Sequence, residues 1–181
     1  FGYDYSQAGA YFITICTANR GVFFGEVVAD ENTAHQVTLR GTPLALTAVT
    51  CWRKIPEFHP FAVPADFVVM PDHVHGILFI ERPPDYVGGG PNQFGPQRDN
   101  LAAVVRGFKM GVTKAAREIA AIDAATSVGA SASPAGRFGW QSRFHDRIIR
   151  TDEELARLQW YIEQNPTRWH EERGQPDGIF R

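Results

Sequence analysis

Residues 66–80 have the sequence DFVVMPDHVHGILFI, and this stretch decides the fold. Its two halves are apolar and rich in β-branched and aromatic residues, which favours strands. Between them, Pro71 and Asp72 are typical of a short turn. Near-continuous hydrophobicity of this kind is typical of strands that are covered on both faces. We therefore expect two adjacent strands at the centre of a sheet.

Two histidines, His73 and His75, flank Val74 on the second of these strands. Side chains alternate between the two faces of a strand, so both imidazoles project from one face and Val74 from the other. Two imidazoles at this spacing can hold one divalent metal ion, although a third ligand and substrate oxygens must complete its coordination. Alternatively, one or both rings pack as neutral side chains and bond to backbone carbonyls.

The remaining sequence alternates strand and helix patterns. Thr42 followed by Pro43 is typical of a helix start, and residues 151–154 form a capping box before the last helix, which we expect Pro166 to end. We further expect strands over 11–16, 23–28 (pairing with the first) and 140–150, and helices from 42 to near 56 and over 101–119. This order predicts an α+β fold, an antiparallel sheet with packed helices.

Size and composition indicate one domain spanning residues 1–181, with flexible loops near 83–99 and 123–139. Apolar runs of only a few residues exclude a membrane-spanning segment, and no signal peptide is visible. Cys16 and Cys51 are too few for a disulfide framework or a thiolate metal site. These features favour a cytoplasmic protein.

Charge is distributed unevenly along the chain. The formal net charge of −2 indicates no global affinity for nucleic acids or membrane surfaces. Residues 98–150, however, contain nine lysines and arginines and only four acidic side chains. This stretch is the candidate anion-binding surface, and the alternative is a solvated helix face with scattered surface arginines.

Tyr161 and Asn165 lie four residues apart in the last expected helix, on one stripe beside its apolar face. A phenol and an amide placed in this way can reach the same small volume, one as a nucleophile and the other as an oxygen ligand to a hard metal ion. Alternatively, the Tyr161 ring packs at the edge of the core with its hydroxyl in water, and Asn165 closes the helix before Pro166.

Four segments of the chain together resemble one known family. They are YFITICT (11–17), MPDHVHG (70–76), WQSRFHDRIIR (140–150) and YIEQNPTRW (161–169), in this order. The chain from Tyr11 to about Pro176 resembles the single-tyrosine His-hydrophobic-His transposases, especially the branch associated with repetitive extragenic palindromes (REP) in bacteria. The resemblance implies a ferredoxin-like α+β fold.

The resemblance also implies a site. His73 and His75 correspond to metal ligands, Tyr161 to the nucleophile and Asn165 to a third metal ligand. Family members often carry Gln at this last position, and Gln164 lies next to it, so both residues remain candidates. The expected cofactor is a divalent metal ion, Mg²⁺ or Mn²⁺, which suits oxygen-rich phosphoryl chemistry.

The implied activity is cleavage and rejoining of single-stranded or hairpin DNA through a 5′-phosphotyrosine intermediate. The protein is expected as a homodimer or a monomer, since the family includes both. The predicted DNA-binding residues are Arg106, Lys109, Lys114, Arg143 and Arg147 on phosphates, with Trp140 either stacking on a base or anchoring its strand. The alternatives are a nonenzymatic or domesticated single-stranded DNA-binding protein, and a metal-dependent hydrolase that activates water.

Overall fold

The computed structural model describes residues 4–29, 37–85, 99–126 and 134–172. The strands are β1 (Gly9–Cys16), β2 (Gly25–Ala29), β3 (Val37–Gly41), β4 (Ala62–Met70), β5 (His73–Ile80) and β6 (His145–Ile149). The helices are α1 (Pro43–Arg53), α2 (Ile55–Phe58), α3 (Leu101–Thr126) and α4 (Asp152–Glu172), with short 3-10 helices η1 (Ala18–Arg20) and η2 (Pro134–Arg137).

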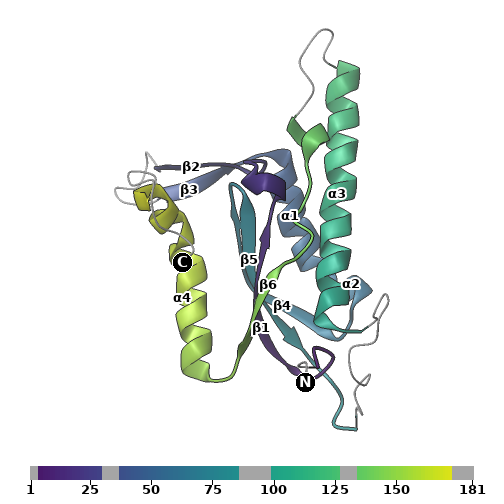
Figure 1. Cartoon of the computed structure of the whole chain (residues 1–181), viewed down its shortest axis with the longest axis vertical. Coiled ribbons are helices and arrows are strands. Elements are labelled where there is room, and N and C mark those ends of the chain that lie inside the picture. Colours follow the sequence, from purple (N-terminus) through teal and green to yellow (C-terminus); the bar gives the residue numbers. More distant parts are fainter. Residues whose placement is uncertain (1–3, 30–36, 86–98, 127–133, 173–181) are drawn as a thin grey trace.

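Four of the strands form one antiparallel sheet in the order β4-β5-β1-β6 (Figure 1). Helix α1 lies between β1 and β4 in the chain, and α3 lies between β5 and β6. This succession of strand, helix, two strands, helix and strand is that of ferredoxin-like folds. The predicted α+β class is therefore confirmed.

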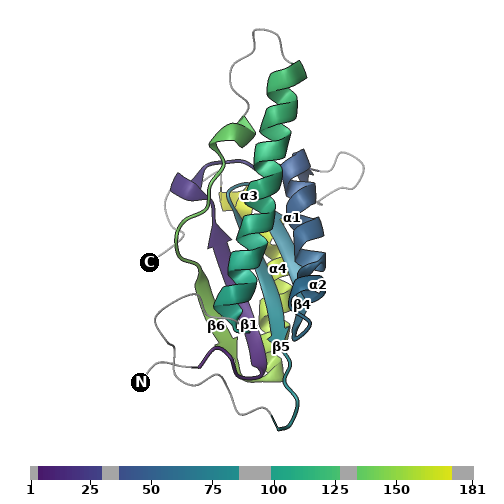
Figure 2. The ribbon, with the colours of Figure 1, turned by 90° about the vertical axis from the view of Figure 1, so that its right-hand side faces the viewer.

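Helices cover both faces of this sheet, α1 and α3 on one side and α4 on the other (Figures 1 and 2). The larger core, under α1 and α3, contains Leu78 of β5. The smaller core, under α4, contains the neighbouring Ile77 together with Leu158 and Ile162. Because side chains alternate along β5, His73 and His75 share the α4 face with Ile77.

The sheet corrects three details of the sequence-based prediction. Strand β5 is internal as expected, but β4 lies at the edge. Residues 23–28 do not pair with β1: β2 pairs with β3 in a separate ribbon, because both sides of β1 are taken by β5 and β6. The expected strand 140–150 is shorter, and Trp140 makes only an isolated bridge to Thr17.

Helix α4 does not end at Pro166 but continues to Glu172. The proline lacks the N–H that would bond to the Ile162 carbonyl, yet the turn beyond it packs onto β5, where the rings of Trp169 and His73 lie 5.7 Å apart. The packing of this turn on β5 thus offsets the backbone hydrogen bond that is lost at Pro166.

The segments predicted to be flexible are only partly described. Helix α3 extends beyond 119 to Thr126, so residues 123–126 are helical, and residues 134–137 form η2. The stretches 86–98 and 127–133 lie outside the described residues.

The predicted helix starts are confirmed. The hydroxyl of Thr42 accepts a hydrogen bond from the backbone N–H of Ala45, and that of Thr151 from the N–H of Glu154. Cys16 is buried and Cys51 is half-buried. Among the described helices, none is long and apolar enough to cross a membrane.

Candidate active site

The imidazoles of His73 and His75 face each other on β5. Their Nε2 atoms are 3.0 Å apart, and the rings meet at an interplanar angle of 77°. Both residues are buried, with exposed fractions of 4% and 3%. The same-face arrangement expected from the sequence is therefore present, and each ring directs its Nε2 atom at the other.

The outer nitrogen of each ring has its own partner. Nδ1 of His73 lies 2.6 Å from Oδ1 of Asp72, whose Oδ2 is 2.9 Å from Nε of Arg20. Nδ1 of His75 lies 2.7 Å from the hydroxyl of Thr14, the residue opposite His75 on β1. Both rings are thus oriented by hydrogen bonds on the side away from their Nε2 contact.

Helix α4 brings Tyr161 and Asn165 to the histidines. The ring of Tyr161 meets the ring of His75 edge to face, with centroids 5.4 Å apart. Asn165 is buried, and a small cavity of about 40 Å³ is lined by Arg20, His73, His75, Tyr161, Asn165, Arg168, Trp169 and Glu172. Of the two candidate third ligands, it is Asn165, and not Gln164, that lines this cavity.

Burial disfavours the protonated form of both histidines. It lowers the pKa of His73, although the hydrogen bond and charge of Asp72 act in the opposite direction. It lowers the pKa of His75 to about 2, assisted by the nearby His73 and Arg20. A neutral imidazole is the form that can donate a lone pair to a metal ion.

The cavity offers a divalent cation few ligands of the usual kinds. Across the described ranges, no three His, Cys, Asp or Glu side chains come together as a metal site. The candidate ligands are therefore two imidazole nitrogens and the amide oxygen of Asn165. Two ligands about 2.1 Å from an ion and at right angles to each other are about 3.0 Å apart, so the two Nε2 atoms are close enough to share one ion once neither carries a hydrogen. Imidazole nitrogen and amide oxygen are donors that such a cation accepts, and substrate oxygens would complete its coordination.

Three further side chains at the cavity suit an anion, and the sequence analysis did not single them out. Arg20 and Arg168 are cationic, and the guanidinium of Arg168 lies 5.2 Å from the centre of the Tyr161 ring. Nε1 of Trp169 is a buried donor with no hydrogen-bond partner among the described residues. Arg168 and Trp169 follow Tyr161 by two helical turns, which places them on the same face of the helix. This spacing could have identified them from the sequence.

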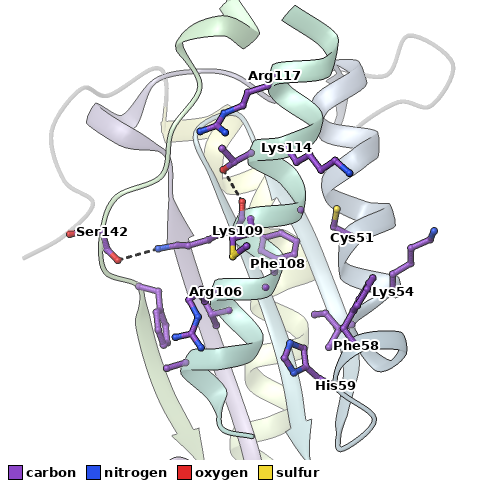
Figure 3. A pocket seen from close by; sticks show the side chains of 18 residues that line it. Cys51, Lys54, Phe58, His59, Arg106, Phe108, Lys109, Lys114, Arg117 and Ser142 are labelled. Carbon is purple, nitrogen blue, oxygen red and sulfur yellow. Dashed lines mark hydrogen bonds between the residues drawn. The ribbon is translucent and has the colours of Figure 1, made fainter. Parts of the chain in front are cut away.

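The predicted DNA-binding residues fall on two sides of the sheet. Arg106, Lys109 and Lys114 lie on α3, away from the histidines, and line a groove of about 1050 Å³ along α1, α2 and α3 (Figure 3). Arg147 lies opposite Phe12 in the β1–β6 pair, and therefore on the α4 face, whereas Arg143 is exposed just before β6.

Several of these predicted residues have contacts within the protein, among them ion pairs of Arg147 with Glu154 and of Lys114 with Glu118. Nζ of Lys109 donates to the backbone oxygens of Gln141, Ser142 and Arg143 at 2.8–3.3 Å. Nε1 of Trp140 donates to the backbone oxygen of Lys109. The Trp140 ring packs against Phe24, Phe108 and Phe138. The geometry favours an anchoring role for Trp140 over base stacking.

Comparison with known proteins gives one relative in sequence. An uncharacterized protein of Haemophilus influenzae is 29% identical over 177 residues, which cover 94% of this chain and 87% of the relative. No family model matches the chain.

Comparison with solved structures gives a REP-associated tyrosine transposase bound to a REP hairpin. The alignment has a TM-score of 0.56 and 18% identity, and it covers 93% of this chain and 72% of the transposase. The chain shares the fold of that transposase. At this level of identity the likeness concerns the fold, so the chemistry has to be argued from the site itself.

Proposed function

We propose that this protein is a metal-dependent transposase or endonuclease that cuts and rejoins single-stranded or hairpin DNA. One observation carries the proposal: Tyr161 and Asn165 of α4 line the same cavity as His73 and His75 of β5. A phenol, an amide and two neutral imidazoles converge at this one small cavity, and such polar convergence favours a reactive site over a packing role.

Tyr161 is the proposed nucleophile. Its phenol oxygen forms a bond to a DNA phosphorus while the bond from that phosphorus to the 3′ oxygen breaks. The phenol gives up its proton and the departing oxygen takes one up, leaving a 5′-phosphotyrosine link and a free 3′-hydroxyl. The link conserves the energy of the broken phosphodiester, so a 3′-hydroxyl can later attack it and rejoin the strand without a nucleotide cofactor.

The other cavity residues provide charge and orientation. The cations of Arg20 and Arg168 stabilise the negative charge that develops on the phosphate oxygens, and the buried N–H of Trp169 offers them a donor. His73, His75 and Asn165 would hold Mg²⁺ or Mn²⁺, which when bound supplies Lewis-acid polarisation of the phosphate.

The basic rim of the groove on α3 is the proposed surface for DNA backbone phosphates. Lys54, Arg106, Lys114 and Arg117 line this groove, and the described part of its lining contains no acidic residue (Figure 3). Arg147 of β6, an edge strand, lies on the α4 face, where it pairs with Glu154, and Arg143 is exposed just before β6. DNA as the partner is supported by the solved transposase of the same fold, which is bound to a REP hairpin.

A labelled cleavage assay tests the proposal. The protein is incubated with hairpin oligonucleotides carrying a different label at each end, plus Mn²⁺ or EDTA, and the products are separated under denaturing conditions. We expect the 3′ label to remain with the protein and the 5′ label to appear on a released fragment, only when Mn²⁺ is present. Release of both labels would indicate hydrolysis by water, and binding without cleavage would indicate a nonenzymatic DNA-binding protein.

A further inference from the structure

The hydrogen bonds around the two histidines determine where their protons lie. Oδ1 of Asp72 accepts at 2.6 Å from Nδ1 of His73. A carboxylate paired with Arg20 can only accept, so Nδ1 of His73 carries the hydrogen. In the neutral ring Nε2 of His73 is then a bare acceptor, and its lone pair points at His75.

The assignment for His75 follows from that of His73. The two Nε2 atoms are 3.0 Å apart, and because Nε2 of His73 accepts, Nε2 of His75 must donate. Nδ1 of the neutral His75 is then an acceptor, and the hydroxyl of Thr14, 2.7 Å away, donates to it. This one assignment of hydrogens therefore satisfies every hydrogen bond in the series that runs from Arg20 through Asp72 and the two histidines to Thr14.

This arrangement leaves only His73 ready to bind a cation. An ion between the rings requires the lone pairs of both Nε2 atoms, so the hydrogen of His75 must move from Nε2 to Nδ1. Nδ1–H then needs an acceptor. The Thr14 hydroxyl can serve, because the same oxygen both donates and accepts.

We propose that Thr14 is a positioning residue that allows His75 to exchange tautomers when a divalent cation binds, while Asp72, held by Arg20, keeps His73 permanently in its ligand tautomer. This inference rests on the proposed function, since it assumes a cation at the His pair. The exchange neither adds nor removes a proton from the protein.

Asp72, which fixes the tautomer of His73, is itself held rigidly. The backbone oxygen of Asp72 accepts from both the N–H and the hydroxyl of Thr17. Arg20 has a φ of 53°, in the left-handed region, as does Asn19 before it, and its guanidinium also contacts Sγ of Cys16. These contacts hold the turn between β4 and β5, so the Asp72 carboxylate keeps one orientation toward His73.

Contacts with neighbouring rings hold His75, the histidine that exchanges tautomers. The ring of His75 stacks on Phe12 with centroids 5.3 Å apart, and the Tyr161 ring packs against it at an interplanar angle of 70°. These neighbours oppose rotation of the His75 ring. When a cation binds, the hydrogen can therefore move from Nε2 to Nδ1 of this ring while the Thr14 hydroxyl rotates to accept it.

Nitrogen NMR on ¹⁵N-histidine protein measures the tautomers directly, in the absence of DNA. For the metal-free protein we expect the Nδ1–H form for His73 and the Nε2–H form for His75. With Zn²⁺ as a diamagnetic probe, both should be in the Nδ1–H form. Finding His75 already in the Nδ1–H form without metal would overturn the proposal, and this readout needs no variant.

Mn²⁺ affinity measured by calorimetry tests the role of Thr14. Thr14→Val removes the hydroxyl at nearly constant volume, and we expect affinity about 10- to 100-fold weaker. Thr14→Ser should restore it. Thr47→Val, which removes an exposed hydroxyl bonded to the Pro43 oxygen, is the matched control and should bind as wild type does. If wild type and Thr14→Val bind Mn²⁺ equally, this inference alone fails. If wild type binds no ion, the metal role in the proposed function fails with it.

Discussion

The rings of Tyr161 on α4 and His75 on β5 meet at an interplanar angle of 70°, with centroids 5.4 Å apart. This contact joins a candidate nucleophile to a candidate ligand pair. Tyr161 also lines the cavity next to the imidazoles. A variant that keeps the ring and lacks the hydroxyl tests the role of the hydroxyl by itself.

Replacing Tyr161 by Phe removes one hydroxyl and almost no volume. If the phenol is the nucleophile, the covalent protein–DNA product should be lost while hairpin binding and the free energy of unfolding stay close to wild type. Denaturing gels and a binding assay measure the two effects. Tyr5→Phe is the control, since Tyr5 packs against the core on the other face of the sheet and should retain activity. Wild-type yield of covalent product from Tyr161→Phe would contradict the mechanism, as would mass spectrometry placing the phosphate on Tyr11 or Tyr86.

The metal-free protein should lose stability in mild acid. Burial lowers the pKa of both His73 and His75, so in the folded state they take up protons at lower pH than unfolded histidines, whose pKa is about 6.5. The unfolded state then binds more protons, and the free energy of unfolding falls as the pH is lowered through this range. Urea unfolding between pH 7 and 5 measures it. The double variant His73→Gln/His75→Gln should show a flatter dependence, and an identical slope would argue against the prediction.

Gly76 has no room for a side chain. A Cβ at this position would lie 2.5 Å from the ring of Trp52, which is stacked on Phe67. We expect Gly76→Ala to lower the free energy of unfolding by about 1–3 kcal/mol, because the packed rings must shift. Urea denaturation measures the change. Gly136→Ala, where the nearest atom is 3.6 Å from the added Cβ, is the control. Equal stability of the two variants would show that the Trp52 ring yields easily.

Lys109 and Lys114 should behave differently although both lie on α3. Lys114 is exposed, so Lys114→Ala should weaken hairpin binding and reduce the slope of log affinity against log salt by about 0.7 if it contacts a single-strand phosphate. Lys109 bonds three backbone oxygens, so Lys109→Ala should chiefly lower stability. Binding titrations over a salt series and thermal unfolding separate the two effects. An unchanged slope for Lys114→Ala would remove this residue from the DNA surface.

Local patterns in the sequence were enough to predict several elements. The apolar run of residues 66–80 with its Pro-Asp turn predicted β4 and β5, and the period of two predicted that His73 and His75 share a face. The helix starts at Thr42 and Thr151 were likewise predicted, because caps depend on residues three positions apart. Such features are encoded by neighbours in the chain, so they can be inferred without knowing the tertiary structure.

Contacts between distant segments decided the rest. No local signal shows that α3 and α4 cover opposite faces, which separates Lys114 from Tyr161, or that β2 pairs with β3 instead of β1. Pro166 would end an isolated helix, but the packing of Trp169 against His73 extends it. Arg20, Thr14 and Asp72 meet the histidines only because β1, η1 and the turn before β5 adjoin in the folded sheet. The sequence alone determined the residue types of the site, whereas tertiary packing determined their orientation, because long-range hydrogen bonds form only when the sheet brings these segments together.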